Sequence, residues 1–276
     1  MTTEAVASRF AVDLEFAREI AERAGRILFE RYERVEQVDY KSARDVVTEV
    51  DHLSEALIIE AIRARFPGDG ILAEESGAHR KPGADGTGSL AAGRTWVIDP
   101  LDGTINYANG IPYFCVSVGL VVDGAPSVGV IHDPMRGETF AADLDGPAVL
   151  GHATIHASDK DKLGDCVVSL ALGGRAVATR VRAIRKAIRV SRNMGSAALA
   201  LAYVANGRFD AFIQSGGMSA WDVAAAGLIV ERAGATVTGM AGGPWFDVER
   251  ATRTFGMIAA PSQHHAELLR IAREPG

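Results

Sequence analysis

The sequence predicts an α/β fold built from layers of sheets and helices, and two observations carry this prediction. From about residue 150 onward, short apolar runs alternate with segments of helical periodicity. Such alternation is typical of layered α/β proteins, because the helices cover the faces of the sheet that the strands form. In addition, 47% of the 276 residues are hydrophobic and 23% are charged, which is close to the globular average and allows a large buried core.

The first half opens with two predicted amphipathic helices, over residues 12–35 and 49–65, and Pro67-Gly68 ends the second. Apolar residues recur at helical spacing in both, so one stripe of each helix should face the core. The residues expected on these stripes are Val12, Phe16, Ile20, Ala24, Ile27, Leu28, Arg31 and Tyr32 in the first helix and Leu53, Leu57 and Ile62 in the second.

Short apolar and β-branched runs predict the strands of the first half. These runs cover residues 71–73, 95–98, 115–122, 126–132 and 138–142. The pair Asp123-Gly124 is a hairpin signal between two of them. The stretch 76–93 is rich in Gly and Ala and lacks periodicity, which predicts a mobile surface loop.

The second half repeats strand and helix in turn. Strands are predicted at 166–172, 210–213, 235–238 and 256–259, and helices at 176–188, 196–206, 221–233 and 262–273. We expect His264 and His265 to be solvated in the first turn of the last helix, and Trp245 to lie in a turn. No linker separates the halves, so we expect a single unit over 1–276, with an N-terminal half over 1–150 and a C-terminal half over 151–276.

Charge and cysteine usage limit the possible partners and the compartment. The formal net charge is −6 and the sequence pI is near 5.7, so we expect no nucleic acid and no membrane as partner. Residues 1–16 lack the continuous apolar core of a signal peptide, and no run approaches the ~20 apolar residues of a membrane span. Cys115 and Cys166 lie in apolar strands without metal-type spacing, which indicates free buried thiols. We expect a cytoplasmic protein.

Acidic residues gather at the boundaries of the predicted elements in four places. They are Asp45 and Asp51, Glu74-Glu75, Asp99 with Asp102, and Asp222. Taken singly, such residues are common as helix caps and turn formers, and Asp222 alone is an ordinary candidate for a helix N-cap. Their combination points to a shared site.

The most informative segment is Asp99-Pro-Leu-Asp102-Gly103-Thr104. Asp99 follows a predicted buried strand, at the strand end where ligands collect in open α/β sheets. Asp102 comes three residues later, so both carboxylates can face one point. Gly103 permits a close backbone approach, and Thr104 offers a hydroxyl and can open a helix.

Several carboxylates at one point need cations. At about 4 Å, two like charges repel by roughly 1 to 4 kcal/mol at effective dielectric constants of 80 to 20. Carboxylate oxygens suit Mg²⁺, and the absence of a Cys or His cluster argues against zinc. The hypothesis is that these acids hold Mg²⁺, and that the metal receives an anionic phosphate.

These segments resemble the signature blocks of the inositol monophosphatase family. The blocks are Asp45-Val-Val-Thr48-Glu-Val-Asp51, Glu74-Glu75-Ser76, Trp96-Val-Ile-Asp99-Pro-Leu-Asp102-Gly-Thr-Ile-Asn106-Tyr and Trp221-Asp222-Val-Ala-Ala-Ala-Gly, in the family's order. Gly195-Ser196-Ala197-Ala198 is similar to a family segment that borders the substrate. The resemblance spans residues 15 to 260.

The resemblance implies a layered αβαβα sandwich of the sugar-phosphatase type, usually a homodimer. It also implies lithium-sensitive, Mg²⁺-dependent hydrolysis of a small phosphorylated metabolite, with two to three ions in each site. The leading substrate is inositol 1-phosphate. Histidinol phosphate, fructose 1,6-bisphosphate and phosphoadenosine phosphate stay open, because they are substrates of related family members.

The family's roles carry over to matching positions. One Mg²⁺ would be held by Glu74, Asp99 and the Leu101 carbonyl. A second would be held by Asp99, Asp102 and Asp222. A third, more weakly bound ion would be supported by Glu74. Gly103 and Thr104 would donate to the phosphate. Asp51 would pair with Thr104 and, with Glu74, orient the attacking water. The substrate-binding positions would be Gly103, Thr104, Gly195, Ala197, Gln214 and Asp222, and Lys41 is similar to a family lysine in the preceding loop.

The substrate end departs from the family pattern. Animal members carry a glutamate before the Trp-Asp block, whereas Gln214 or Ser215 occupies that region here. A bisphosphate substrate would favour a basic residue nearby; Arg192 and Arg208 could reach, although surface arginines at helix ends are the commoner explanation. A different class of function is a metal-binding interaction or regulatory protein, and the intact acidic set argues against loss of catalysis.

Overall fold

We describe a computed structural model of the chain, which covers residues 8–34, 38–42, 45–79, 89–174, 177–250 and 252–273. The side chains of residues 35–47 also lie outside this description, and they include the predicted Lys41 and Asp45. The helices are α1 (Ala11–Arg31), α2 (Glu49–Arg65), α3 (Thr104–Ala108), α4 (Val177–Ala187), α5 (Ala197–Ala205), α6 (Ala220–Arg232) and α7 (Ser262–Arg273).

Two large sheets hold most of the strands. The first has the order β10-β9-β8-β7-β6-β5-β3-β4 and the second β12-β11-β13-β15-β14, while β1 and β2 form a separate antiparallel pair. The strands are β1 (Val38–Ser42), β2 (Asp45–Thr48), β3 (Gly70–Ala73), β4 (Gly77–His79), β5 (Arg94–Asp102), β6 (Cys115–Val122), β7 (Ala125–Asp133), β8 (Glu138–Asp143), β9 (Val149–Leu150), β10 (Ala153–Thr154), β11 (Val167–Ala171), β12 (Val190–Arg192), β13 (Ala211–Met218), β14 (Thr236–Gly239) and β15 (Phe255–Ala260).

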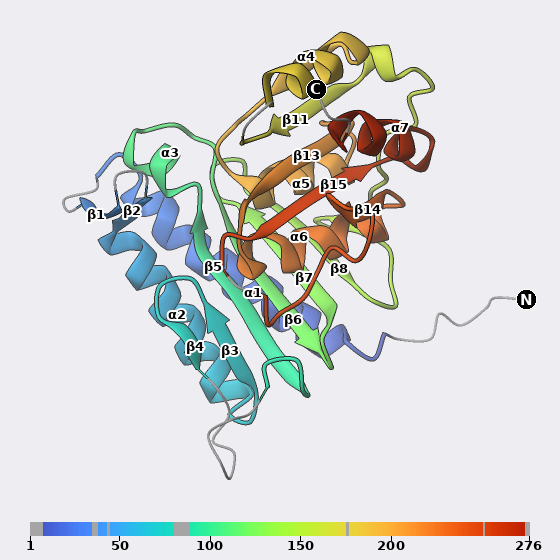
Figure 1. Cartoon of the computed structure of the whole chain (residues 1–276). Helices are drawn as coiled ribbons and strands as arrows, with labels where there is room; N and C mark the ends of the chain where they lie inside the picture. Colours follow the sequence, from blue (N-terminus) through green and yellow to red (C-terminus); the bar gives the residue numbers. More distant parts are fainter. Residues whose placement is uncertain are drawn as a thin grey trace, which may run out of the picture.

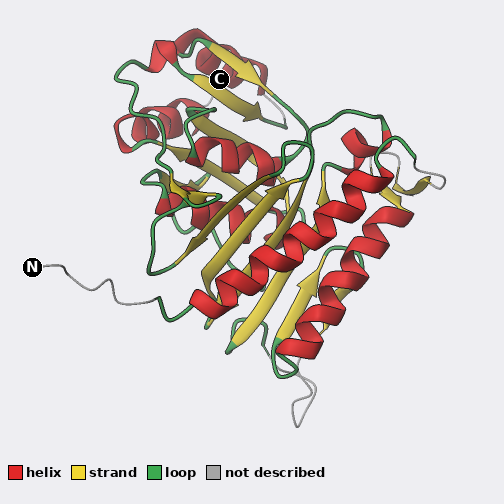
Figure 2. Ribbon diagram, turned by 180° about the vertical axis from the view of Figure 1, so that it is seen from behind, coloured by secondary structure: helices red, strands yellow, loops and turns green. Residues whose placement is uncertain are grey.

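The elements stack in five layers (Figure 1). Seen from behind, α1 and α2 lie side by side across the outer face of the eight-stranded sheet (Figure 2). Helices α5 and α6 lie between the two sheets, and α4 and α7 cover the far face of the five-stranded sheet. The predicted αβαβα sandwich is confirmed.

Three apolar clusters fill the spaces between these layers, because side chains alternate between the two faces of each strand. In β5, Trp96 and Ile98 point toward α1 and α2, whereas Val97 points toward α5 and α6. In β13, Phe212 joins the central cluster and Ile213 the cluster beneath α4 and α7. Both sheets are therefore covered on both faces.

At the start of α1, the buried face of the helix begins one residue later than the sequence predicted. Val12 is 60% exposed, whereas Asp13 is buried and its carboxylate accepts hydrogen bonds from Arg94 at 2.7 and 3.2 Å. The charge of Asp13 is compensated by this ion pair, so the carboxylate can be buried. In α2, Leu53 is 42% exposed and also contradicts its predicted inward place, while Ile62 is fully buried as expected.

Several other expectations are corrected by tertiary contacts. The stretch 76–93 is not a loop throughout, because β4 pairs with β3; residues 80–88 of it lie outside the described part of the chain. His265 is buried beside the hydroxyl of Thr238, with 3.0 Å from Nε2 to Oγ1. Trp245 packs its ring against α6 at Gly227, where an added Cβ would come within 2.5 Å of the ring.

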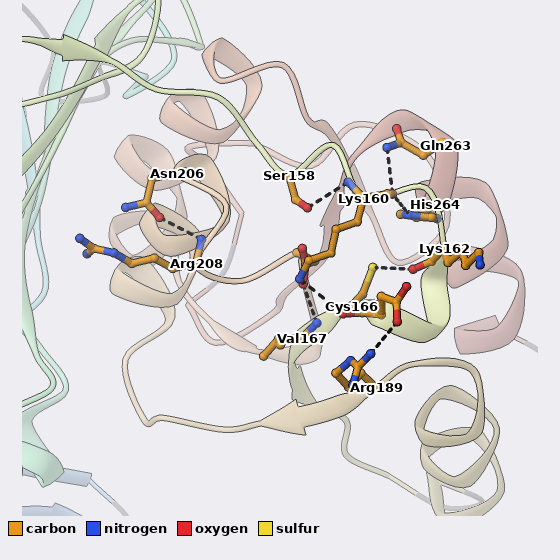
Figure 3. A network of polar contacts seen from close by, with 12 residues as sticks. Ser158, Lys160, Lys162, Cys166, Val167, Arg189, Asn206, Arg208, Gln263 and His264 are labelled. Atoms are coloured by element: carbon orange, nitrogen blue, oxygen red, sulfur yellow. Dashed lines mark hydrogen bonds and ion pairs between the residues drawn. The ribbon is translucent and has the colours of Figure 1, made fainter.

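A polar network ties the connection between the two sheets to the second sheet (Figure 3). Lys160 Nζ lies 2.8 Å from Oδ2 of the buried Asp210, which also accepts from the Val167 N–H at 2.6 Å. The carbonyl oxygen of Lys160 lies 2.6 Å from His264 Nε2. His264 is therefore buried and bonded, which contradicts its expected solvation.

Two glycines let α6 lie close to the eight-stranded sheet. At Gly129 in β7, an added Cβ would stand 2.5 Å from the carbonyl oxygen of Ala225 and 2.9 Å from its Cα. At Gly119 in β6, the nearest atom would be the Ala225 nitrogen at 3.3 Å. Because the opposing atoms belong to a helix backbone, they cannot rotate away.

No helix in the described part of the chain combines the length and the apolar character needed to cross a membrane. Cys115 and Cys166 are both free and buried, as expected.

We expect Gly129→Ala to destabilise the protein by about 1–3 kcal/mol, because the new methyl group must push α6 away from the sheet. Urea unfolding would measure the loss. The matched control is Gly68→Ala, at an exposed glycine with no atom within 4 Å of the added Cβ. Equal stability of the two variants would contradict this account of the close packing.

Candidate functional site

A cavity of about 660 Å³ opens where β5 and α3 meet the N-terminal ends of α5 and α6. Its volume is within the usual range for small-molecule sites. Its lining includes these predicted site residues: Glu74, Asp99, Leu101, Asp102, Gly103, Thr104, Gly195, Ala197, Gln214 and Asp222. Asp51 is fully buried behind the lining and reaches the cavity through Thr104.

Asp99 is the most enclosed of the acids that line the cavity, with 1% of its surface exposed. Strand β5 continues past Asp99 to Asp102, and its pairing with β6 is irregular between these two residues. The Leu101 N–H donates to Asp99 Oδ1 at 3.0 Å. Burial, followed by the nearby charges of Glu74, Asp102 and Asp222, raises the pKa of Asp99 well above its usual value.

Asp102 joins the two halves of the molecule. Its Oδ2 accepts from the Ser196 hydroxyl at 2.6 Å and from the Ala198 N–H at 2.7 Å, so the carboxylate binds the first turn of α5. Ser196 is the N-cap of that helix, and its own Oγ accepts from the Leu199 N–H. Burial raises the pKa of Asp102, and these hydrogen bonds lower it in part.

Asp222 stands in the first turn of α6, but it is not the N-cap as one sequence interpretation proposed. Ser219 is the N-cap, and Asp222 is the third helical residue of a capping box, where its Oδ2 accepts from the Ser219 N–H at 2.5 Å. Burial, followed by the charge of Asp102, raises the pKa of Asp222 to about 7.

Gly103 and Thr104 form the turn from β5 into α3. Gly103 has φ +105°, a left-handed conformation that glycine adopts without strain, and an added Cβ would meet Tyr113 and Phe114 at 3.1 Å. The Thr104 hydroxyl lies 3.1 Å from Asp51 Oδ1 and 3.0 Å from the Leu101 carbonyl oxygen.

Asp51 is fixed in turn by the capping box of α2. Its Oδ2 accepts from the Thr48 N–H at 2.8 Å and from the Thr48 hydroxyl at 2.6 Å. Burial raises the pKa of Asp51, and the bonds from Thr48 and Thr104 lower it in part. The Thr48 and Asp51 pair in the sequence thus explains both the start of α2 and the contact with Thr104.

Glu74 enters the cavity from the end of β3, where its N–H donates to the Ile98 carbonyl at 3.2 Å. The turn that follows is held by Glu55 of α2, a buried residue that the sequence did not single out. Glu55 accepts from the N–H groups of Glu75 and Ser76 at 2.8 and 2.9 Å.

The donor chemistry fits a hard divalent cation. Ligand oxygens of Asp99, Asp102 and Asp222 lie within 4.8 Å of one another, and the raised pKa values of all three show that the bare cluster resists full ionisation. A cation with oxygen ligands would relieve this repulsion. The glutamate at position 74 adds negative charge beside Asp99.

Of the remaining residues considered in the sequence analysis, some lie at the cavity and others lie away from it. Asn106 donates to the Met194 carbonyl at 2.7 Å and so places Gly195 beside α3. Gln214 faces the cavity, with Nε2 donating to the Gly216 carbonyl at 3.1 Å, whereas Ser215 is not in the lining. Arg208 is held by Glu138 and Arg192 is also outside the lining, so neither reaches the site.

Arg253 is a lining residue that sequence reasoning missed. It lies just before β15, far from every recognised motif, and it carries no pattern that marks it. The only sequence signal is a basic residue between a Gly-rich turn and a buried strand.

Comparisons with known proteins agree with this geometry. The family model described as "Inositol monophosphatase family" matches residues 11–275. The Nus factor SuhB of Pasteurella multocida is 39% identical over 240 residues, covering 83% of this chain and 86% of that protein. A protein of Thermotoga maritima named fructose-1,6-bisphosphatase/inositol-1-monophosphatase is 35% identical over 230 residues, covering 83% and 85%. A solved IMPase structure of Thermotoga maritima superposes with a TM-score of 0.82 at 31% identity, covering 95% and 96%.

We expect divalent-cation binding to weaken as the pH falls below about 7. Asp222, with a pKa raised to about 7, must lose its proton before it can act as a ligand. The dissociation constant for Mg²⁺, measured by calorimetry, should rise by up to about tenfold per pH unit below that value. Asp222→Asn should weaken this dependence between pH 6 and 8, and an unchanged pH profile in that variant would contradict the assignment.

Proposed function

The chain belongs to the inositol monophosphatase family and is a phosphatase, and from this premise we propose that it hydrolyses inositol 1-phosphate or a similarly small phosphate monoester with Mg²⁺. The observation that carries the proposal is the gathering of Asp99, Asp102 and Asp222 within 4.8 Å beside Gly103 and Thr104.

The proposed metal ligands come from three segments. Glu74, Asp99 and the Leu101 carbonyl would hold one ion; Asp99, Asp102 and Asp222 would hold a second, and Glu74 would support a third. When bound, Mg²⁺ supplies Lewis acidity that activates water and balances the charge of the phosphoryl group. The protein's task is to hold the acids ionised and aligned, which it does through the helix-end bonds to Asp102 and Asp222.

The phosphate position follows from the turn between β5 and α3. Gly103 and Thr104 line the cavity, and their backbone N–H groups would donate to phosphate oxygens there. Gly103 adopts a left-handed conformation close to Tyr113 and Phe114, and the backbone of this turn would meet the phosphate. Positioning of this kind contributes much of the catalysis in phosphoryl transfer.

The attacking water would be oriented by Thr104 and Glu74. The Thr104 hydroxyl donates a hydrogen bond to the buried Asp51 at 3.1 Å, which holds the Thr104 side chain in place. The Thr104 oxygen can then accept a hydrogen bond from the water. Glu74 faces the same cavity and would accept the water's second proton. In this scheme the water attacks phosphorus directly, so no covalent intermediate with the protein is formed.

The leaving alcohol would lie toward Gly195, Ala197 and Gln214. Gln214 offers an amide where a carboxylate would bind ring hydroxyls more strongly, so selectivity for inositol should be modest. Histidinol phosphate, fructose 1,6-bisphosphate and phosphoadenosine phosphate therefore remain alternative substrates. The similarity to a Thermotoga maritima protein named fructose-1,6-bisphosphatase/inositol-1-monophosphatase supports a broad range of substrates.

The other properties proposed here follow the family resemblance and the sequence. They are a homodimer, inhibition by lithium, a cytoplasmic location, and one folded unit that spans both halves. The acidic surface, with a net charge of −6, supports small metabolites as partners rather than nucleic acid or membranes.

A second candidate function is regulatory binding, because the Pasteurella multocida relative is named as a Nus factor. The complete carboxylate cluster favours catalysis, since a binding role alone does not need it. If partners captured by the parent protein bind Asp99→Asn equally well and no phosphate ester is hydrolysed, the regulatory function would be the better description.

We expect Asp99→Asn to lower kcat on inositol 1-phosphate by about 100-fold or more, because it removes the carboxylate shared by both proposed ion sites. The metal-free variant should remain folded, since the change removes one repelling charge. Phosphate release and thermal unfolding would measure the two effects. Asp161→Asn, at an exposed position, is the matched control.

The substrate test is phosphate release from inositol 1-phosphate, glycerol 2-phosphate, fructose 1,6-bisphosphate, histidinol phosphate and phosphoadenosine phosphate. We expect turnover that needs Mg²⁺, stops with a chelator and falls at millimolar lithium. The ranking of kcat/KM identifies the substrate class. Hydrolysis that is unaffected by chelation would contradict the proposed chemistry.

A further inference from the structure

Arg253 is the one cation among the described residues that line the cavity. The other charged residues of the lining are Glu74, Asp99, Asp102 and Asp222, and all are acidic. Arg253 thus brings a positively charged guanidinium to an otherwise acidic lining. A positive group there attracts a negative group of the substrate.

The backbone of Arg253 has an uncommon conformation. Its φ is +61°, in the left-handed region where a side chain other than Asn, Asp or Gly is rare. In the described part of the chain, the other non-glycine residues with positive φ are Glu33 and Asp123, and Asp123 belongs to a tight hairpin. Glycine would adopt the conformation of Arg253 without strain, so the presence of arginine points to a role for its side chain.

Two hydrogen bonds hold Arg253 in this conformation. Its N–H donates to the Ser219 hydroxyl oxygen at 3.0 Å, and its carbonyl accepts from the Gly217 N–H at 3.1 Å. Both partners belong to the junction between β13 and α6, which continues directly to Asp222. Arg253 is therefore fixed to the same segment that supplies a metal ligand.

The position of Arg253 differs from that of the phosphate contacts. Gly103 and Thr104 reach the cavity from the eight-stranded sheet, whereas Arg253 reaches it from the loop before β15 of the five-stranded sheet. Strands β5 and β15 belong to these two different sheets (Figure 1). A substrate whose reacting phosphate lies at Gly103 would extend its alcohol portion toward the second sheet, where Gln214 and Arg253 lie.

We propose that Arg253 is a specificity-determining residue that binds a second anionic group, a phosphate or carboxylate, on the alcohol portion of the substrate. This inference rests on the proposed phosphatase function and selects within it: esters that carry a second negative group are preferred over esters of neutral polyols. The charge of Arg253 also lowers the pKa of Asp222 in part.

The test compares kcat/KM for fructose 1,6-bisphosphate with kcat/KM for glycerol 2-phosphate, at saturating Mg²⁺. In Arg253→Met, we expect this ratio to fall by about tenfold or more, the effect of one charge-assisted hydrogen bond, mainly through KM for the bisphosphate. Arg253→Lys should retain most of the ratio. Arg192→Met, at an exposed arginine outside the lining, is the matched control and should change the ratio less than about twofold.

A fourth variant separates a functional role from a structural one. Arg253→Gly should be at least as stable as the parent in thermal unfolding, because glycine adopts the left-handed conformation without strain. Its ratio of the two kcat/KM values should fall as far as in Arg253→Met. A ratio that is unchanged in both Met and Gly variants would overturn the proposal. So would an equal loss on both substrates, which would mean that Arg253 acts only through Asp222 and the metal.

Failure of the underlying function would look different. If the parent protein hydrolyses neither ester with Mg²⁺, the phosphatase proposal for these substrates fails, and the specificity role of Arg253 fails with it. If the parent hydrolyses both and the four variants follow the expected order, both proposals stand.

Discussion

The repulsion between buried carboxylates is the constraint on which the rest of this structure depends. Ligand oxygens of Asp99, Asp102 and Asp222 lie within 4.8 Å of one another. At an effective dielectric constant of about 20, each charged pair opposes folding by roughly 3 kcal/mol or more. Burial is the main cause of the raised pKa values of the three acids, and the neighbouring negative charges add to it at Asp99 and Asp222. The fold must hold these carboxylates close together when no metal is bound, and bound cations would reduce the repulsion between them.

Helix N-termini provide most of that restraint. Asp102 accepts from the first turn of α5, and Asp222 and Asp51 are the third residues of the capping boxes that begin α6 and α2. Backbone N–H groups at these positions have no partner within their helices and favour a negative charge. The hydrogen bonds that each acid accepts at a helix start stabilise that helix and also fix the carboxylate at the site. The site is consequently rigid, because a shift of any of these acids would also leave a helix end without its cap.

The central helix α6 connects the site to the core. It packs against the eight-stranded sheet at Gly119 and Gly129 and against Trp245 at Gly227, so its axis is fixed by close backbone contacts. Its first turn holds Asp222, and its N-cap Ser219 holds Arg253. Packing between the sheets therefore determines where the last metal ligand and the proposed specificity residue stand relative to β5.

The sequence by itself determined the helices, most strands and the identity of the acidic set. Helical periodicity and capping patterns are local, so α2 begins and ends where predicted, and the segment from Asp99 to Thr104 carries its strand, turn and helix start within six residues. The family resemblance added the expected roles, which remain proposals.

Only the tertiary structure decided which distant segments meet. It placed the α5 N-terminus on Asp102, Glu55 behind Glu74, and Arg253 in the cavity wall. It also reversed the local expectations at His264 and His265, where a polar group is buried because a partner far away in the sequence forms a hydrogen bond with it. The physical reason is the same in each case. A hydrogen bond or ion pair between residues far apart in the sequence stabilises the arrangement, and hydrophobic periodicity cannot predict it because periodicity depends only on residues close together in the chain.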